Sequence, residues 1–137
     1  MNLKVGYIPQ NYFDLYNNDL NAIEFLSKTF NKAEHTEIST YLGSLNFTRE
    51  EMYTNISKLS GGQKVKLYFA KMNLERAEMM VLDEPTRNLS PTSQVEVLEA
   101  LKSFKGAIIS VSHDRNYINN VCDRIYKLNK SGLFRIK

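Results

Sequence analysis

The stretch that decides the fold is Met79-Met80-Val81-Leu82-Asp83-Glu84, in which four apolar residues precede two adjacent carboxylates. A short apolar run of this length is typical of a buried strand in a parallel sheet. Pro85 follows and stops the strand, so the two acids lie at its C-terminal end. Open α/β sheets bind their ligands at that end of the strands. The alternative is a strand followed by an acidic turn, and the flanking residues must decide between the two.

The composition is that of one soluble globular domain. The chain has 137 residues, 42% of them apolar and 24% charged, which is enough to bury a core. A net charge of +3 is too small to argue for nucleic acid by itself. The single Cys122 allows no internal disulfide and is typical of a reducing compartment. No membrane span or signal-peptide pattern is found, so we expect a cytoplasmic protein without membrane insertion.

Hydrophobic periodicity predicts a strand over residues 3–8, then three helices with no strand between them. The first helix is expected to begin behind Asn18 or Asp19, and the third at Thr48, where Glu51 completes a capping box. The apolar stripes are Leu20, Ile23, Leu26 and Phe30 in the first helix, and Ile38, Tyr41, Leu42 and Leu45 in the second. We expect these helices to form an insertion on one side of a sheet.

Strands and helices alternate after Ser60, which predicts an α/β fold with a parallel sheet. Ser90 is expected to cap a helix that opens with Pro91, and a second short apolar strand follows over 107–111. A brief helix over 115–121 then leads to strands over 124–128 and 133–136. The turn between these last two strands predicts a C-terminal hairpin.

The run Leu59-Ser60-Gly61-Gly62-Gln63 opens the helix that precedes the acidic strand. Ser60 and Gln63 have the spacing of a capping box, which explains both residues. It does not explain the two glycines, each of which costs about 1 kcal/mol relative to alanine inside a helix. Glycine at a helix N-terminus lets an anion reach bare N–H groups at the positive end of the helix dipole. The run therefore favours a phosphate-facing turn.

Five motifs in order resemble those of ABC-type ATPases, over nearly the whole chain. They are the signature at 59–63, the Walker B strand with Asp83 and Glu84, the Q-loop glutamine Gln10, the D-loop at 88–90 and the switch histidine His113. The resemblance implies a P-loop NTPase-like α/β core with a helical insertion and a C-terminal hairpin. The Q-loop strand and loop would span 1–15, the helical subdomain 16–59, and the signature helix, Walker B, D-loop, H-loop and C-terminal strands 60–137.

Two runs are similar to the ABC-F class, namely 104–115 and 82–91. Members of this class are soluble twin-cassette ATPases that act on ribosomes, among them translation factors and antibiotic-resistance proteins. The resemblance thus implies a ribosome or its RNA as a partner of the intact protein. Ser90 stands where an aspartate is common in the D-loop, which weakens the expectation of the usual contact across the dimer.

The resemblance also implies roles in ATP hydrolysis, a reaction that depends mainly on positioning and electrostatics. Asp83 would help to hold Mg²⁺, and Glu84 would be the general base for the attacking water. Gln10 would contact Mg²⁺ and that water, and His113 would bind the γ-phosphate. Because the family dimerises head to tail, the signature turn would contact the ATP of a second cassette through Ser60, Gly61, Gly62 and Gln63.

No Gly-Lys-Ser or Gly-Lys-Thr occurs in the sequence, so the Walker A motif of the family is not found in it. We interpret the chain as the C-terminal portion of a cassette, and expect it to bind ATP weakly and not to hydrolyse it alone. In the family the P-loop strand lies beside the strand over 107–111. That strand should therefore have an open edge, which we expect the 124–128 strand or another copy of the chain to fill.

Two other interpretations remain open. The chain could belong to the cassette of a membrane transporter, with the helical insertion docked on a transmembrane partner. It could also be a non-catalytic remnant that serves as an interaction module. The run 106–112 and the pair Asp114-Arg115 favour ABC-F over a transporter, and the presence of both Glu84 and His113 argues against a remnant.

Overall fold

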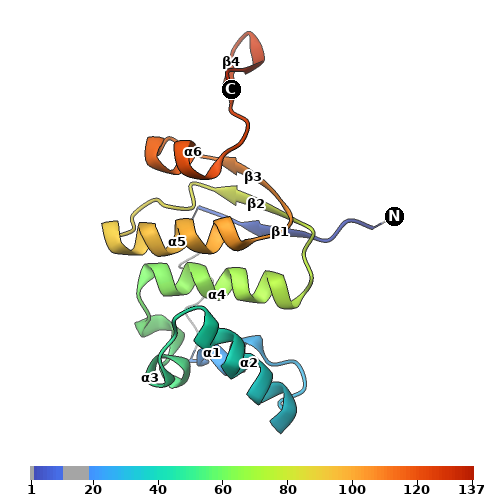
Figure 1. Ribbon diagram of the computed structural model, residues 1–137, viewed down its shortest axis with the longest axis vertical. Helices are drawn as coiled ribbons and strands as arrows, with labels where there is room; N and C mark the ends of the chain where they lie inside the picture. The colour runs from blue at the N-terminus through green and yellow to red at the C-terminus, as the bar shows by residue number, and fades with distance from the viewer. Residues whose placement is uncertain (1, 11–18) are drawn as a thin grey trace.

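The computed structural model of the chain describes residues 2–10 and 19–137. It has a three-stranded parallel sheet, a group of helices on one side of it and a separate two-stranded hairpin (Figure 1). The elements are β1 (Val5–Ile8), α1 (Ala22–Leu26), α2 (Lys32–Ser44), α3 (Arg49–Tyr53), the 3₁₀ turn η2 (Ile56–Lys58), α4 (Gly61–Leu74), β2 (Met79–Asp83), α5 (Pro91–Ser103), β3 (Ala107–Val111), α6 (Arg115–Val121), β4 (Tyr126–Asn129) and β5 (Gly132–Arg135). The α/β fold expected from the sequence is confirmed.

The sheet has the order β1-β2-β3, so the acidic strand is central and both neighbours run parallel to it. In register, Ile8 lies beside Leu82 and Leu82 beside Ser110. Ile8 and Leu82 are buried on the face that the helices cover. The alternate positions face the other way, and there Tyr7 and Ile109 are 57% and 55% exposed. One face of the sheet therefore carries the core and the other is largely open.

Helices α4 and α5 lie alongside each other and cover the core face of the sheet (Figure 1). The approach of α4 to β1 is close, because a Cβ built on Gly6 would lie 2.5 Å from the Met72 sulfur. Lys66 of α4 is 5% exposed and joins two parts of the fold. Its Nζ donates to the Leu45 carbonyl at 3.0 Å and lies 3.8 Å from a Glu96 carboxylate oxygen on α5.

The helical insertion is present, but its first helix is shorter than the sequence predicted. Residues 11–18, including the expected cap Asn18, lie outside the described part of the chain. The cap is Asn21 rather than Asp19, because Asn21 and Glu24 form a complete capping box. The helix ends at Leu26, and Phe30 lies outside it with a φ of 56° and 70% of its surface exposed. The expected stripe therefore stops one turn early.

The carboxylate of Glu34 explains why the chain leaves the helix there. It accepts hydrogen bonds from the N–H groups of Lys28, Thr29 and Phe30 at 2.7 to 2.9 Å, and from the Thr29 hydroxyl at 2.7 Å. These N–H groups are thereby satisfied without helical bonds. The hydrogen bond from the Lys28 N–H, with those from Thr29 and Phe30, lowers the pKa of Glu34 to about 2.

The later helices follow the sequence prediction. Thr48 and Glu51 form the predicted capping box of α3, and Ser60 and Gln63 form that of α4. Ser90 caps α5, which opens with Pro91. The apolar stripe of α2 is confirmed at Ile38 and Leu42, which are both buried.

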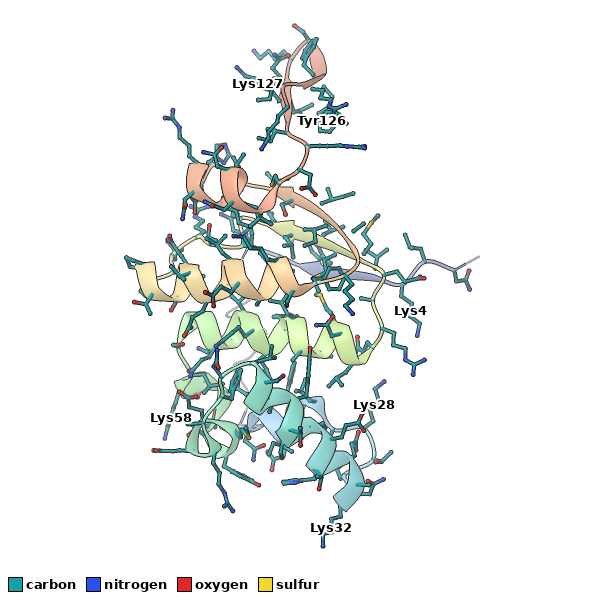
Figure 2. The ribbon with its side chains drawn as sticks, viewed as in Figure 1. Lys4, Lys28, Lys32, Lys58, Tyr126 and Lys127 are labelled. Atoms are coloured by element: carbon teal, nitrogen blue, oxygen red, sulfur yellow. The ribbon has the colours of Figure 1, made fainter. Side chains whose placement is uncertain are left out.

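Strand β3 forms an edge of the sheet, as expected, with Val111 60% exposed. The expectation that the 124–128 strand fills this edge is wrong. β4 instead pairs antiparallel with β5 in a hairpin of its own, in which Ser131 N–H donates to the Asn129 side chain at 2.8 Å. Closing this short turn orders fewer residues than bringing β4 back to β3. The hairpin stands away from the helices, with Tyr126 and Lys127 on it (Figure 2).

Candidate functional site

The candidate site lies at the edge of the sheet where the three parallel strands end. Gln10 lies two residues beyond β1, Asp83 is the last residue of β2 and Glu84 follows it. His113 lies two residues beyond β3. Since the strands are parallel and in register, these four side chains share one edge. The structure therefore brings together the residues that the sequence predicted as catalytic and metal-binding.

Glu84 and His113 are in direct contact. The Glu84 Oε1 lies 2.5 Å from the His113 Nδ1, and the His113 N–H points at Oε2 from 3.4 Å. The Glu84 side chain is only 15% exposed, whereas that of His113 is 92% exposed. The carboxylate is thus held from one side, and the imidazole remains open to a ligand.

The backbone at Glu84 is strained. Its φ is 49°, a left-handed conformation that costs a residue with a Cβ about 1 kcal/mol or more. The Glu84 N–H donates to the Val111 carbonyl at 2.8 Å, which continues the β2–β3 ladder by one bond. The conformation turns the chain sharply after the strand and directs the carboxylate toward His113. Strain of this kind is found most often at functional positions.

A buried hydrogen bond joins the loops that carry Glu84 and His113. Thr86 is 3% exposed as a residue, and its hydroxyl donates to the half-buried Asp114 Oδ2 at 2.8 Å. The other oxygen of Asp114 caps α6 by accepting from the N–H groups of Asn116 and Tyr117. Thr86 and Asp114 therefore fix His113 relative to Glu84. Sequence reasoning assigned neither of them a role, although an aspartate between a strand and a helix is a helix-cap signal.

Behind these loops, Tyr117 of α6 is fully buried, and its hydroxyl lies 2.5 Å from the Ser110 hydroxyl on β3. Burial raises the pKa of Tyr117 to about 12. The phenol therefore stays neutral at any physiological pH. It serves to fix α6 against β3, directly beneath the His113 loop.

The contact between Glu84 and His113 lies at an open hollow of about 480 Å³. The residues that line it are Glu84, Thr86, Arg87, Asn88, Gln94, His113 and Asp114. Gln10 reaches this group from β1, because its amide lies against the Arg87 guanidinium. With its oxygen facing the guanidinium, the amide accepts from Nη1 and, at 3.3 Å, from Nε. Sequence reasoning did not single out Arg87 or Gln94.

Oxygen ligands for Mg²⁺ are present at this edge. Mg²⁺ is held by one or two carboxylates together with waters and substrate phosphates. Asp83 supplies a half-buried carboxylate and Gln10 an amide oxygen. No group of three or more His, Cys, Asp or Glu side chains gathers within 2–10 and 19–137. One carboxylate and one amide oxygen would leave the other positions of the ion to waters and phosphate oxygens, which is how Mg²⁺ is usually bound.

The signature turn at 60–63 has a packing contact in addition to the expected capping box. Its capping box is formed, with the Gln63 N–H donating to the Ser60 hydroxyl at 3.2 Å and the Ser60 N–H to Gln63 Oε1 at 3.1 Å. Gly62, however, is buried against α5, where a Cβ would lie 2.8 Å from the Cβ of Ser93. The close packing of α4 on α5 is therefore enough to explain why residue 62 is a glycine. The turn is not part of the hollow, and its contact with a second cassette stays a prediction.

In the described ranges no helix is long and apolar enough to cross a membrane.

Comparison with known proteins identifies relatives over most of the chain. The family model described as ABC transporter matches residues 1–87. Protein GCN20 of Saccharomyces cerevisiae is 36% identical over 90% of this chain and 16% of its own length. ATP-binding cassette sub-family F member 3 of Homo sapiens is 32% identical over 99% of this chain and 19% of its own length. ABC transporter F family member 2 of Arabidopsis thaliana is 33% identical over 96% of this chain and 20% of its own length. The chain thus spans a fifth or less of these relatives.

Two solved structures share the fold. An inward-facing metal-chelate type ABC transporter matches with a TM-score of 0.77 at 21% identity, over 96% of this chain and 58% of that one. The ATP-binding cassette MJ0796, in a dimeric post-hydrolysis state with ADP and Pi, matches with a TM-score of 0.70 at 19% identity. The match covers 90% of this chain and 58% of that one.

Proposed function

Because the chain belongs to the ABC transporter family and its relatives include ABC-F proteins, we propose that it supplies the Walker B, switch-histidine and signature elements of an ATP-hydrolysing cassette. The observation that carries this proposal is the contact of Glu84 with His113 at 2.5 Å on the edge of a hollow. A carboxylate beside space for a ligand can take a proton from a bound water within its reach, and the imidazole in contact with it helps to fix its position.

Glu84 is the general base in this proposal. Its carboxylate is held by His113 and by the left-handed turn of its own backbone, so it needs little reorganisation to meet a water. The Nδ1 of His113 lies on Glu84, and in the imidazolium form its Nε2–H can also donate to a phosphate oxygen in the hollow. Thr86 and Asp114 hold the two loops at the distance this requires.

Magnesium would be held by Asp83 and Gln10 together with nucleotide phosphates and water. When bound, it neutralises charge on the transferred phosphoryl group. Asp83 is suited to this because its carboxylate ends the central strand, at the same edge as Glu84. The chain's own contribution is then to orient a water with Glu84 and to hold the phosphate with His113.

A second cassette is the proposed partner of the signature turn. The positive end of the α4 dipole and the N–H groups at 60–63 would meet the ATP held by that cassette. Support comes from MJ0796, whose printed description is of a dimer. The close packing of Gly62 on α5 holds the first turn of α4 against that helix.

The ABC-F relatives extend the proposal to the intact protein. We propose that it works in the cytoplasm on ribosomes, as a translation factor or as a ribosome-protecting resistance protein. The relatives named as F family members support the ABC-F class, and the ribosome is proposed from the resemblance of 82–91 and 104–115 to that class.

The experiment measures ATP turnover by the full-length protein that carries this chain. Glu84→Gln preserves shape but removes the base, so the rate should fall about 100-fold or more while ATP still binds. Glu99→Gln, on the exposed side of α5, is the matched control and should leave the rate unchanged. Turnover within about twofold of wild type in Glu84→Gln would exclude Glu84 as the base. Co-sedimentation with ribosomes in the presence of ATP tests the partner, and protein that stays in the supernatant would contradict that part alone.

A further inference from the structure

Among the described residues that line the hollow, Arg87 is the one lysine or arginine. Two carboxylates, those of Glu84 and Asp114, line it as well. Each of these already has a partner, Glu84 in His113 and Asp114 in Thr86. Within the described ranges Arg87 forms no ion pair. The guanidinium thus borders the hollow without a salt bridge, although two carboxylates line the same space.

The backbone places Arg87 firmly. The Arg87 N–H donates to the Glu84 carbonyl at 3.1 Å, which closes a turn of four residues. Left-handed residues lie at both ends of this segment, Glu84 with a φ of 49° and Asn88 with a φ of 61°. Thr86, next to Arg87, is buried and bonded to Asp114. The side chain of Arg87 is exposed, so the turn is fixed while the guanidinium can move.

The guanidinium now contacts the amide of Gln10, and with the amide oxygen turned toward it the two form a hydrogen bond. This is the oxygen that the proposed function gives to Mg²⁺. A neutral amide is a weaker acceptor for a guanidinium than a phosphate, which two parallel N–H groups can grip. A phosphate in the hollow would therefore draw Arg87 away from Gln10.

We propose that Arg87 binds a phosphate group in the hollow and that, in doing so, it releases the amide oxygen of Gln10. The residue then has two positions: on Gln10 without a ligand, and on phosphate oxygens with one. Release of Gln10 couples the arrival of the phosphate to the completion of the Mg²⁺ site. The inference rests on the proposed function for the identity of the ligand, an ATP phosphate, and it deepens the account of that same hollow.

The test is an NMR titration of this chain with inorganic tripolyphosphate, without metal. The Arg87 Nε–H and the Gln10 side-chain NH₂ signals should shift together and saturate with one affinity, because one event moves both. Arg87→Gln should weaken binding about 10-fold, since charge-assisted bonds are lost. Arg87→Lys keeps the positive charge but loses the paired N–H donors of the guanidinium, so it should recover part of the lost affinity. Arg49→Gln, in α3 and outside the hollow, removes the same charge and is the control.

The outcomes separate this inference from the proposed function. Equal weakening by Arg87→Gln and Arg49→Gln would reduce the effect to net charge and overturn the inference. A titration in which the Arg87 signal shifts and the Gln10 signal does not would also overturn the inference, as would one in which neither signal shifts. None of these results touches the Glu84→Gln turnover measurement, which can still succeed.

Discussion

Gly62→Ala is the substitution that separates packing from phosphate binding at the signature turn. Alanine is the better helix former, and in an open helix the change would stabilise the protein by about 1 kcal/mol. At Gly62 the new Cβ would lie 2.8 Å from the Ser93 Cβ and 3.0 Å from the Ser93 Cα and a Glu96 oxygen. Overpacking of this kind costs about 1–3 kcal/mol. We therefore expect a net loss of up to about 2 kcal/mol.

Gly43→Ala is the matched control, because Gly43 lies in α2 and its added Cβ would meet nothing closer than the Met52 Cε at 3.9 Å. It should stabilise the chain by several tenths of a kcal/mol, up to about 1. The assay is urea unfolding of both variants beside wild type, followed by circular dichroism. If Gly62→Ala were as stabilising as Gly43→Ala, α4 and α5 would not approach as closely as described. The glycine would then have no structural cause, and the phosphate-facing interpretation would stand alone.

Thr86→Val should cost about 1–2 kcal/mol in urea unfolding, since it leaves Asp114 without its buried donor. Thr92→Val, at the exposed start of α5, should stay within about 0.5 kcal/mol of wild type, and equal effects would show that the Thr86 bond contributes nothing. The lowered pKa of Glu34, about 2 against an ordinary 4.5, means that its hydrogen bonds stabilise the fold above pH 4.5 and are lost as pH falls through 2. The difference in melting temperature between wild type and Glu34→Gln should therefore shrink across that window. A difference that is flat from pH 6 to pH 2 would contradict the hydrogen-bonding pattern of Glu34.

The parts that sequence reasoning predicted correctly are set by neighbours along the chain. The acidic strand ends at Asp83 because Pro85 follows closely, and the capping boxes at Thr48 and Ser60 need only residues three positions apart. The convergence of Gln10, Glu84 and His113 follows from parallel strands alone. These features could be predicted because each depends on a local signal or on a general rule of sheet topology.

The parts that sequence reasoning missed depend on contacts between distant segments. The carboxylate of Glu34 reaches back to end α1, which no helical period reveals. Strand β4 pairs with β5 and not with the edge strand β3. The sequence does not show which of these two pairings is more stable. The packing cause of Gly62 needs the distance between α4 and α5. The candidate role of Arg87 follows from the contact of its guanidinium with Gln10, which the sequence does not reveal.

The central claim is that Gln10, Glu84 and His113 surround one phosphate site at the end of the sheet. Paramagnetic broadening by Mn²⁺–ATP tests it most directly, because Mn²⁺ takes the place of Mg²⁺ and broadens only nearby NMR signals. We expect the signals of Gln10, Glu84 and His113 to broaden first, at a fraction of the Mn²⁺–ATP concentration needed to affect Lys32 or Lys127 on the distant parts of the fold (Figure 2). Broadening that is uniform, or strongest at α2 or at the hairpin, would contradict the account.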